Sequence, residues 1–164
     1  MANTILFRMP SGIAGAISRP QNLTVEPHVL DSTKPFAAYG LGGKISGGKF
    51  VPVEAGDTAD VIAGIFVRPS PTASQPDKIR QISSGFNFTG DNLKRGYVTV
   101  NIGGNASAVA LNAPVYMRVD NPTDSSPLGA FLAAADGDNT VQITNAYFNG
   151  PGDADGNIEL AYNI

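Results

Sequence analysis

The fold class is decided by residues 140–164, which read TVQITNAYFNGPGDADGNIELAYNI. Within this stretch, residues 140–148 and 158–164 are each of strand length and are bounded by residues that favour turns. The segment between them is made of Asn, Gly, Pro, Asp and Ala, which is typical of tight connections. A similar short run lies at 115–119. This third of the chain therefore predicts β-strands joined by turns, with no reactive cluster among them.

Further strands are predicted toward the N-terminus. Residues 97–102 show the cleanest alternation, which places two sets of side chains on opposite faces: Tyr97, Thr99 and Asn101 against Val98, Val100 and Ile102. Residues 59–68 predict a buried strand, and Gly47-Gly48 predicts a hairpin turn. Pro52 assigns the run 50–53 to a sheet edge, because proline cannot donate a ladder hydrogen bond.

Two segments are less specific. Residues 115–119 and 131–134 predict a hairpin around the loop that contains Pro122 and Pro127, whereas residues 106–112 fit either a strand or a short helix. Strands at intervals of about 8–15 residues, with polar turns between them, indicate a single all-β domain. We expect a small β-barrel or sandwich that spans residues 36–164.

Residues 1–35 differ from the rest of the chain. They contain four prolines, which favour extended backbone: Pro10, Pro20, Pro27 and Pro35. Residues 9–20 within this segment show neither a clean helical nor a clean strand period. One interpretation is a frayed terminus. The apolar content favours the other, an extended N-terminal arm that becomes ordered on a neighbouring subunit.

The composition excludes several classes of function. Of the 164 residues, 15% are charged, the net charge is −3 and there is no cysteine. An acidic chain without a basic stripe is a poor nucleic-acid binder, and no apolar stretch approaches the ~20 residues that span a membrane. Without cysteine there is no disulfide and no thiolate chemistry, so the chain suits a reducing cytosol.

No arrangement of residues predicts catalysis, a cofactor or a metal. The single histidine, His28, lies in the predicted arm, where a catalytic base could not be held precisely enough. The carboxylate pairs Glu54 with Asp57 and Asp136 with Asp138 lie among turn residues, which explains them without acid–base chemistry. Residues 153–159 alternate oxygen ligands as a calcium loop does, but the glycine falls at the wrong position, so a hairpin turn is favoured.

Three stretches carry a family resemblance. They are the extended arm leading into residues 36–40, the stretch 54–68 in which a strand follows Gly56-Asp57-Thr58, and the closing hairpin from Ala146 to Ile164. Together they resemble the structural cement, or head decoration, proteins of tailed bacteriophages. The resemblance implies a non-enzymatic virion protein, made in the cytoplasm of the host bacterium. It also implies a trimer on the outer surface of the capsid that bridges neighbouring major capsid subunits.

From this resemblance we expect the arm to supply the contacts with the major capsid protein. The expected contact residues are Ile5, Phe7, Arg8, Ile13 and Ile17, with Arg19 meeting an acidic patch of the capsid. Two other functions remain open at this stage. A tail-tube or neck subunit would also be a compact β domain with an arm, and a carbohydrate-binding β-sandwich would need aromatic platforms, which a chain without tryptophan supplies poorly.

Overall fold

A computed structural model describes residues 12–69 and 89–164, and this part of the chain is almost entirely β-structure. The strands are β1 (Ile17–Val29), β2 (Gly42–Ser46), β3 (Lys49–Pro52), β4 (Ile62–Val67), β5 (Thr89–Asn101), β6 (Leu111–Arg118), β7 (Phe131–Leu132), β8 (Thr140–Asn149) and β9 (Asn157–Tyr162). Two single 3₁₀ turns, Ala59–Val61 and Gly137–Asn139, are the only helical segments in these two ranges. The predicted all-β class is confirmed.

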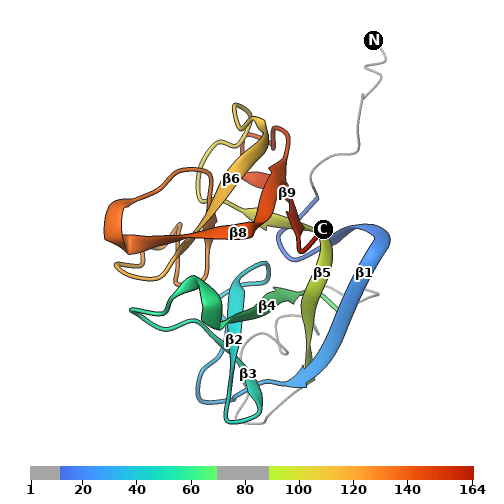
Figure 1. The fold of residues 1–164 in the computed structure, drawn as a ribbon, viewed down its shortest axis with the longest axis vertical. Helices are drawn as coiled ribbons and strands as arrows, with labels where there is room; N and C mark the ends of the chain where they lie inside the picture. Colours follow the sequence, from blue (N-terminus) through green and yellow to red (C-terminus); the bar gives the residue numbers. More distant parts are fainter. Residues whose placement is uncertain (1–11, 70–88) are drawn as a thin grey trace.

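All nine strands belong to one sheet, in the order β3-β2-β4-β5-β9-β8-β6-β7, with β1 paired to β5. The pairings between the named strands are antiparallel. The sheet curls on itself, with β2, β3 and β4 in one half, β6, β8 and β9 in the other, and β5 passing between the halves (Figure 1). The architecture is therefore a half-barrel made of one curled sheet rather than two packed sheets.

The sequence pattern of β5 explains its central place. Val98 and Val100 are completely buried in the main core, as the predicted alternation requires. Thr99 on the opposite face is also buried, at 1% exposed, and the backbone of residues 15 and 16 pairs with its main chain. The N–H of Gly15 donates to the carbonyl of Thr99 at 2.8 Å, and the N–H of Thr99 donates to the carbonyl of Ala16 at 2.8 Å. Both edges of β5 are therefore hydrogen-bonded at Thr99, to β9 on one side and to residues 15 and 16 on the other.

The domain has two hydrophobic clusters. The larger one fills the inside of the curled sheet, with side chains such as Leu93, Phe131, Phe148 and Leu160. The smaller one is aromatic and is built around Phe66, whose ring lies 4.5 Å from Phe36 and 4.7 Å from Tyr39, centroid to centroid. Stacked and tilted aromatic pairs at these separations add to the stabilisation from burial alone.

Residues 17–29, which we expected to belong to an arm separate from the domain, form β1 instead. This strand pairs with β5 from Ile17 opposite Val98 to Val29 opposite Thr89. Its register shifts between Arg19 and Thr24, which accommodates Pro20, and it lies at the outside of the sheet, where Pro27 is also tolerated. Residues 17–29 therefore belong to the sheet, and not to a separate arm that ends at residue 35.

The predicted hairpins are present, with shorter strands than expected. Gly47 and Gly48, both with positive φ, connect β2 to β3, and β3 lies at the end of the sheet as predicted from Pro52. β6 pairs with β7, although β7 has only the two residues Phe131 and Leu132. The ambiguous segment 106–112 becomes a strand only from Leu111. Residues 70–77, for which Pro71 and Pro76 predict a surface loop, and residues 86–88, which fit either a strand or a loop, lie outside the described residues.

Candidate interaction surface

The residues expected to contact a partner are distributed unevenly in the structure. Ile5, Phe7 and Arg8 lie outside the described residues. Ile13 is 55% exposed and so is available to a partner. Ile17 is half-buried and packs against the main core, so it serves the fold of its own chain.

Arg19 forms a two-pronged ion pair within its own chain. Its Nε and Nη2 donate to the two carboxylate oxygens of Glu159 on β9, at 3.0 and 2.7 Å. Its guanidinium also lies over the ring of Tyr97, 4.7 Å from the centroid. The positive charge that we expected to meet an acidic capsid patch is therefore already paired, although the side chain remains 46% exposed.

Glu159 is the acceptor at the centre of this polar cluster. Burial favours the neutral form and acts to raise the pKa of Glu159, but hydrogen bonds from Asn149 and Arg19 outweigh it and hold that pKa below its ordinary value. The cluster lies on the sheet face that carries Tyr97 of β5 and Tyr147 of β8. Both tyrosines pair with Ala161 of β9, which lies between them. It links β1 to β9 across β5.

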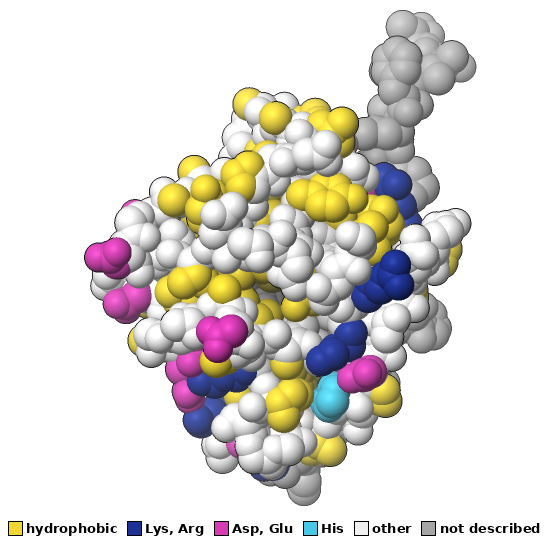
Figure 2. Space-filling view, viewed as in Figure 1, with side chains coloured by type: hydrophobic (Ala, Val, Ile, Leu, Met, Phe, Trp, Pro, Cys, Tyr) yellow, Lys and Arg dark blue, Asp and Glu magenta, His cyan; other side chains and the backbone are white. Residues whose placement is uncertain are grey.

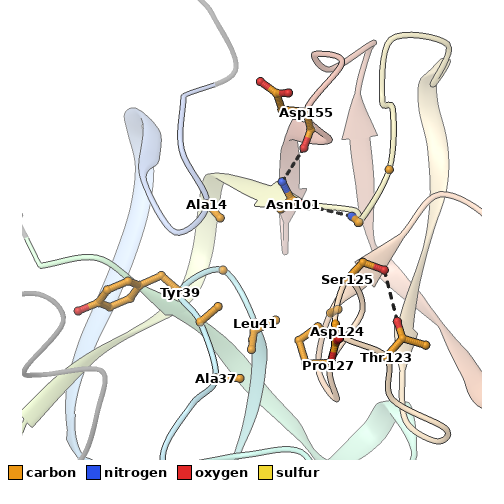
Figure 3. Close-up of a pocket in the computed structure, with 15 residues that line it drawn as sticks. Ala14, Ala37, Tyr39, Leu41, Asn101, Thr123, Asp124, Ser125, Pro127 and Asp155 are labelled. Atoms are coloured by element: carbon orange, nitrogen blue, oxygen red, sulfur yellow. Dashed lines mark hydrogen bonds between the residues drawn. The ribbon is translucent and has the colours of Figure 1, made fainter.

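A groove of about 610 Å³ lies among the described residues, and we consider it as a candidate binding site. Figure 3 shows two facing walls: Ala37, Tyr39 and Leu41 on one side, and the loop 123–127 on the other. Asn101 and Asp155 lie at one end, and Ala14 lies on the side of Tyr39. Sequence reasoning missed this groove, because its lining comes from five separate segments and consists mainly of small residues.

The groove is held in shape by side-chain bonds between its segments. Asn101 donates to the carbonyl of Asp155 at 2.9 Å and accepts from the N–H of Gly103 at 2.9 Å. The wall at 123–127 is fixed by Arg118, whose Nε donates to Ser126 Oγ at 3.2 Å and whose Nη1 donates to Asp136 at 2.7 Å. These bonds favour a preformed site over one that closes on its ligand.

The candidate catalytic groups have structural partners. Glu54 and Asp57 both contact Lys44, at 2.9 and 2.8 Å. Ion pairs with Lys34 and Lys44 lower the pKa of Glu54 to about 2. In the other carboxylate pair, Asp136 with Asp138, the carboxylate of Asp136 accepts a hydrogen bond from Arg118. In the described structure, the His28 side chain contacts the carboxylate of Glu26, at 3.3 Å, and its ring lies near the ring of Phe50.

Residues 153–159 form the turn that the sequence favoured. Asp153 accepts from the backbone N–H of Asn157 at 2.8 Å and from its side-chain amide at 3.1 Å, so its oxygens are used within the hairpin. Within residues 12–69 and 89–164, no group of three or more His, Cys, Asp or Glu could hold a metal ion. The same residues contain no helix long and apolar enough to cross a membrane.

The surface is weakly charged, and several large apolar side chains are exposed on it. On the face in Figure 2, charged side chains lie at the left and right edges and across the lower half, whereas hydrophobic and uncharged atoms cover much of the upper part. The exposed apolar residues are Ile13, Leu23, Val29, Ile45, Val61, Leu111 and Ile164. Leu111, at 63%, is the most exposed of them. The described surface thus offers a preformed groove and exposed apolar residues, both of which suit contact with another molecule.

Comparison with known proteins gives the family. Over residues 1–162 the chain matches the model of the XM1 gp53 minor capsid protein, and it belongs to this family. A chain in the solved structure "The capsid of Myoviridae Phage XM1" has the same fold, with a TM-score of 0.69 and 17% sequence identity over 98% of this chain and 96% of that one. A search of curated proteins gave no match. The predicted resemblance to capsid-associated phage proteins is confirmed, and the chain is a structural protein of a bacteriophage virion.

Proposed function

We propose that this protein is a capsid decoration, or cement, protein that binds the outer surface of the assembled phage head and bridges neighbouring major capsid subunits. The observation that carries the proposal is the match to a minor capsid protein family over residues 1–162. The surface supports it, because exposed apolar side chains such as Ile13 and Leu111 on a weakly charged body suit burial against another protein. The role is non-enzymatic, with no cofactor and no nucleic-acid or membrane partner.

A cement protein stabilises a shell through linkage. A ligand that binds only the assembled lattice lowers the free energy of that state by RT ln(1 + [L]/Kd) per site, about 3–4 kcal/mol at saturating excess. Because a capsid repeats each site many times, modest contacts together oppose rupture by the packaged DNA. A homotrimer seated on several capsid subunits gains further, since its second and third contacts are effectively intramolecular.

The contact residues that we propose follow from exposure. Ile13 and Leu111 are free to meet the major capsid protein, and Ile5, Phe7 and Arg8 are candidates from the sequence alone. Ile17 and Arg19 support β1 in the described structure, so we propose that they contribute by holding Ile13 in place. The minor capsid family favours this role over a tail-tube subunit or a carbohydrate-binding module.

The experiment is to mix the purified protein with expanded, undecorated heads and to image them by cryo-electron microscopy. We expect regular density on the outside of the shell and a higher rupture temperature of the decorated heads. The double variant Ile13→Ser with Leu111→Ser should reduce occupancy at least 10-fold. As a control, Ser107→Ala, at an exposed position near β6, should decorate normally. Density at the neck or tail, or no binding to heads, would contradict the proposal.

A further inference from the structure

The groove has the dimensions of a binding site and a lining suited to a peptide. Its volume of about 610 Å³ lies within the ~300–1,000 Å³ that is usual for ligand sites. The lining includes Gly40, Gly103 and Gly104 with four alanines, so a peptide backbone could approach the floor closely. Gly103 is needed for the groove's own packing, since a Cβ there would lie 2.4 Å from the carbonyl oxygen of Ser125.

The charge of the groove points to a basic occupant. Among the described residues, the only ionisable side chains that line it besides Tyr39 are the carboxylates of Asp124 and Asp155, and none of these lining residues is Lys, Arg or His. Neither carboxylate belongs to an ion pair of the described chain. An occupant that carries one positive charge and otherwise apolar or small side chains would complement this lining.

We propose that the groove binds residues 1–11 of a neighbouring copy of this chain. These residues read MANTILFRMPS, in which Arg8 is the only charged side chain and Ile5, Leu6 and Phe7 form an apolar run beside it. Fully extended, eleven residues reach up to about 36 Å, enough to cross to a neighbouring subunit. Arg8 pairs with Asp124 or Asp155, and the apolar run packs against Leu41 and the alanines of the lining.

Ala14 lines the groove of its own copy, so both the chain's own segment and a neighbour's start within reach of it. Pro10 restricts Met9 to extended backbone, and an extended segment leads away from the point where it starts, at about 3.3 Å per residue. We therefore assign the groove to the neighbour's segment. The inference deepens the proposed homo-oligomer and rests on it. It reassigns Ile5, Phe7 and Arg8 from the capsid to a second copy.

The chain has no cysteine, so disulfide trapping can test the contact without background. Met9→Cys and Gly104→Cys are placed on separate chains that carry different affinity tags and are produced together. A Cβ at Gly104 would meet nothing within 4 Å, so this position accepts a side chain without disturbing the fold. We expect a disulfide-linked heterodimer under mild oxidation. The matched control is Ala108→Cys, exposed in the same loop but outside the groove, which should link poorly.

Binding of residues 1–11 to the groove of their own chain would give a different pattern of disulfides. A chain with both Met9→Cys and Gly104→Cys would then close an internal disulfide, and the separately tagged chains would not link. That outcome overturns the assignment to a neighbour. Absence of both kinds of link, with the thiols accessible to a small reagent, overturns the groove as the binding site of this segment.

A second measurement separates this inference from the proposed function. Gly104→Leu fills the groove, and light scattering should show a monomer where the parent chain and Ala108→Leu remain oligomeric. If Gly104→Leu does not fold, the isosteric pair Asp124→Asn with Asp155→Asn replaces it and should weaken self-association at least 10-fold. Oligomers unchanged by both variants would contradict the groove contact, whereas loss of head binding by chains that still link would contradict the capsid role alone.

Discussion

At the scale of single residues, Arg118 is the side chain on which one wall of the groove depends. It is 7% exposed, and its guanidinium donates to Ser126, Asp136 and the carbonyl of Asn121. A buried guanidinium must be fully hydrogen-bonded, because the cost of removing it from water is large. The loop at 121–126 is therefore organised around this one cation.

Replacing Arg118 with Met should lower the free energy of unfolding by about 1–3 kcal/mol, because Ser126 and Asn121 lose a charged donor. Chemical denaturation followed by fluorescence or circular dichroism measures the change. Asp136→Asn is the matched control and should cost less, since the amide can still accept from Arg118. Equal losses in the two variants would show that the ion pair, and not the guanidinium's other bonds, fixes the loop.

Glu159 makes the fold sensitive to acid. Its ordinary pKa of 4.5 is lowered in the folded state, where burial opposes ionisation but the bonds from Asn149 and Arg19 prevail. A carboxylate with a depressed folded pKa contributes stability that is present above pH 4.5 and is lost as the pH falls through the folded value.

We expect Glu159→Gln to be less stable than the parent chain at pH 7, with the difference shrinking below pH 4.5. Thermal unfolding of both chains between about pH 2 and 7 measures this, and the titration of Glu54 cancels in the comparison. Glu26→Gln, on the exposed part of β1, provides the control. A difference that stays constant across the whole range would contradict the assignment.

At the scale of elements, the pairing of β4 with β5 requires a glycine. At Gly64, opposite Gly43 of β2, φ is 154° and an added Cβ would lie 2.5 Å from the carbonyl oxygen of Leu93. It would come closer still to the side-chain oxygen of Asn92, which is completely buried. The contact atom of Leu93 is a backbone oxygen of the central strand β5, so no side-chain rotation can relieve this contact.

Gly64→Ala should therefore destabilise the domain by at least about 2 kcal/mol, a value typical of overpacking in a core. Gly104→Ala is the matched control, because its Cβ meets nothing within 4 Å and its backbone needs no positive φ. The measurement is the midpoint of thermal unfolding for the two variants. A Gly64→Ala chain as stable as Gly104→Ala would show that β4 can shift away from β5.

The elements best predicted from sequence were those with local signals. Alternation at 97–102, the glycines at 47 and 48 and the proline at 52 each act through neighbouring residues, and the structure has a strand, a hairpin and an edge strand there. β1 was not predicted, because Pro20 and Pro27 disrupt its local pattern and its pairing with β5 is a long-range interaction.

The site was less predictable than the fold. The groove is lined by small residues from segments far apart in the chain, and no local pattern signals such a concavity. Arg19 looked like a free cation because Glu159, its partner, is distant in sequence. Asn163 and Asn145 are joined in the same way, between a strand and the residue that follows β9. Contacts of this kind depend on register, which alternation alone does not fix.

At the scale of the whole molecule, the low charge predicts how the protein binds. With 15% charged residues and a net charge of −3, there is little long-range attraction for salt to screen. For the proposed decoration role, we expect the affinity for heads to change less than about threefold between 50 and 500 mM salt, measured by co-sedimentation at several protein concentrations. Strong weakening by salt would instead indicate that Arg8 and other cations carry the contact.

The placement of β5 has a mechanical consequence. This one strand pairs with β4 along one part of its length, with β9 along another, and with β1 beside both. A pull that separates the two halves of the sheet loads these backbone hydrogen bonds together, so neither half can give way alone. Stretched between two attachment points, the molecule should therefore unfold in a single rupture event, as expected of a protein that holds two subunits together under load.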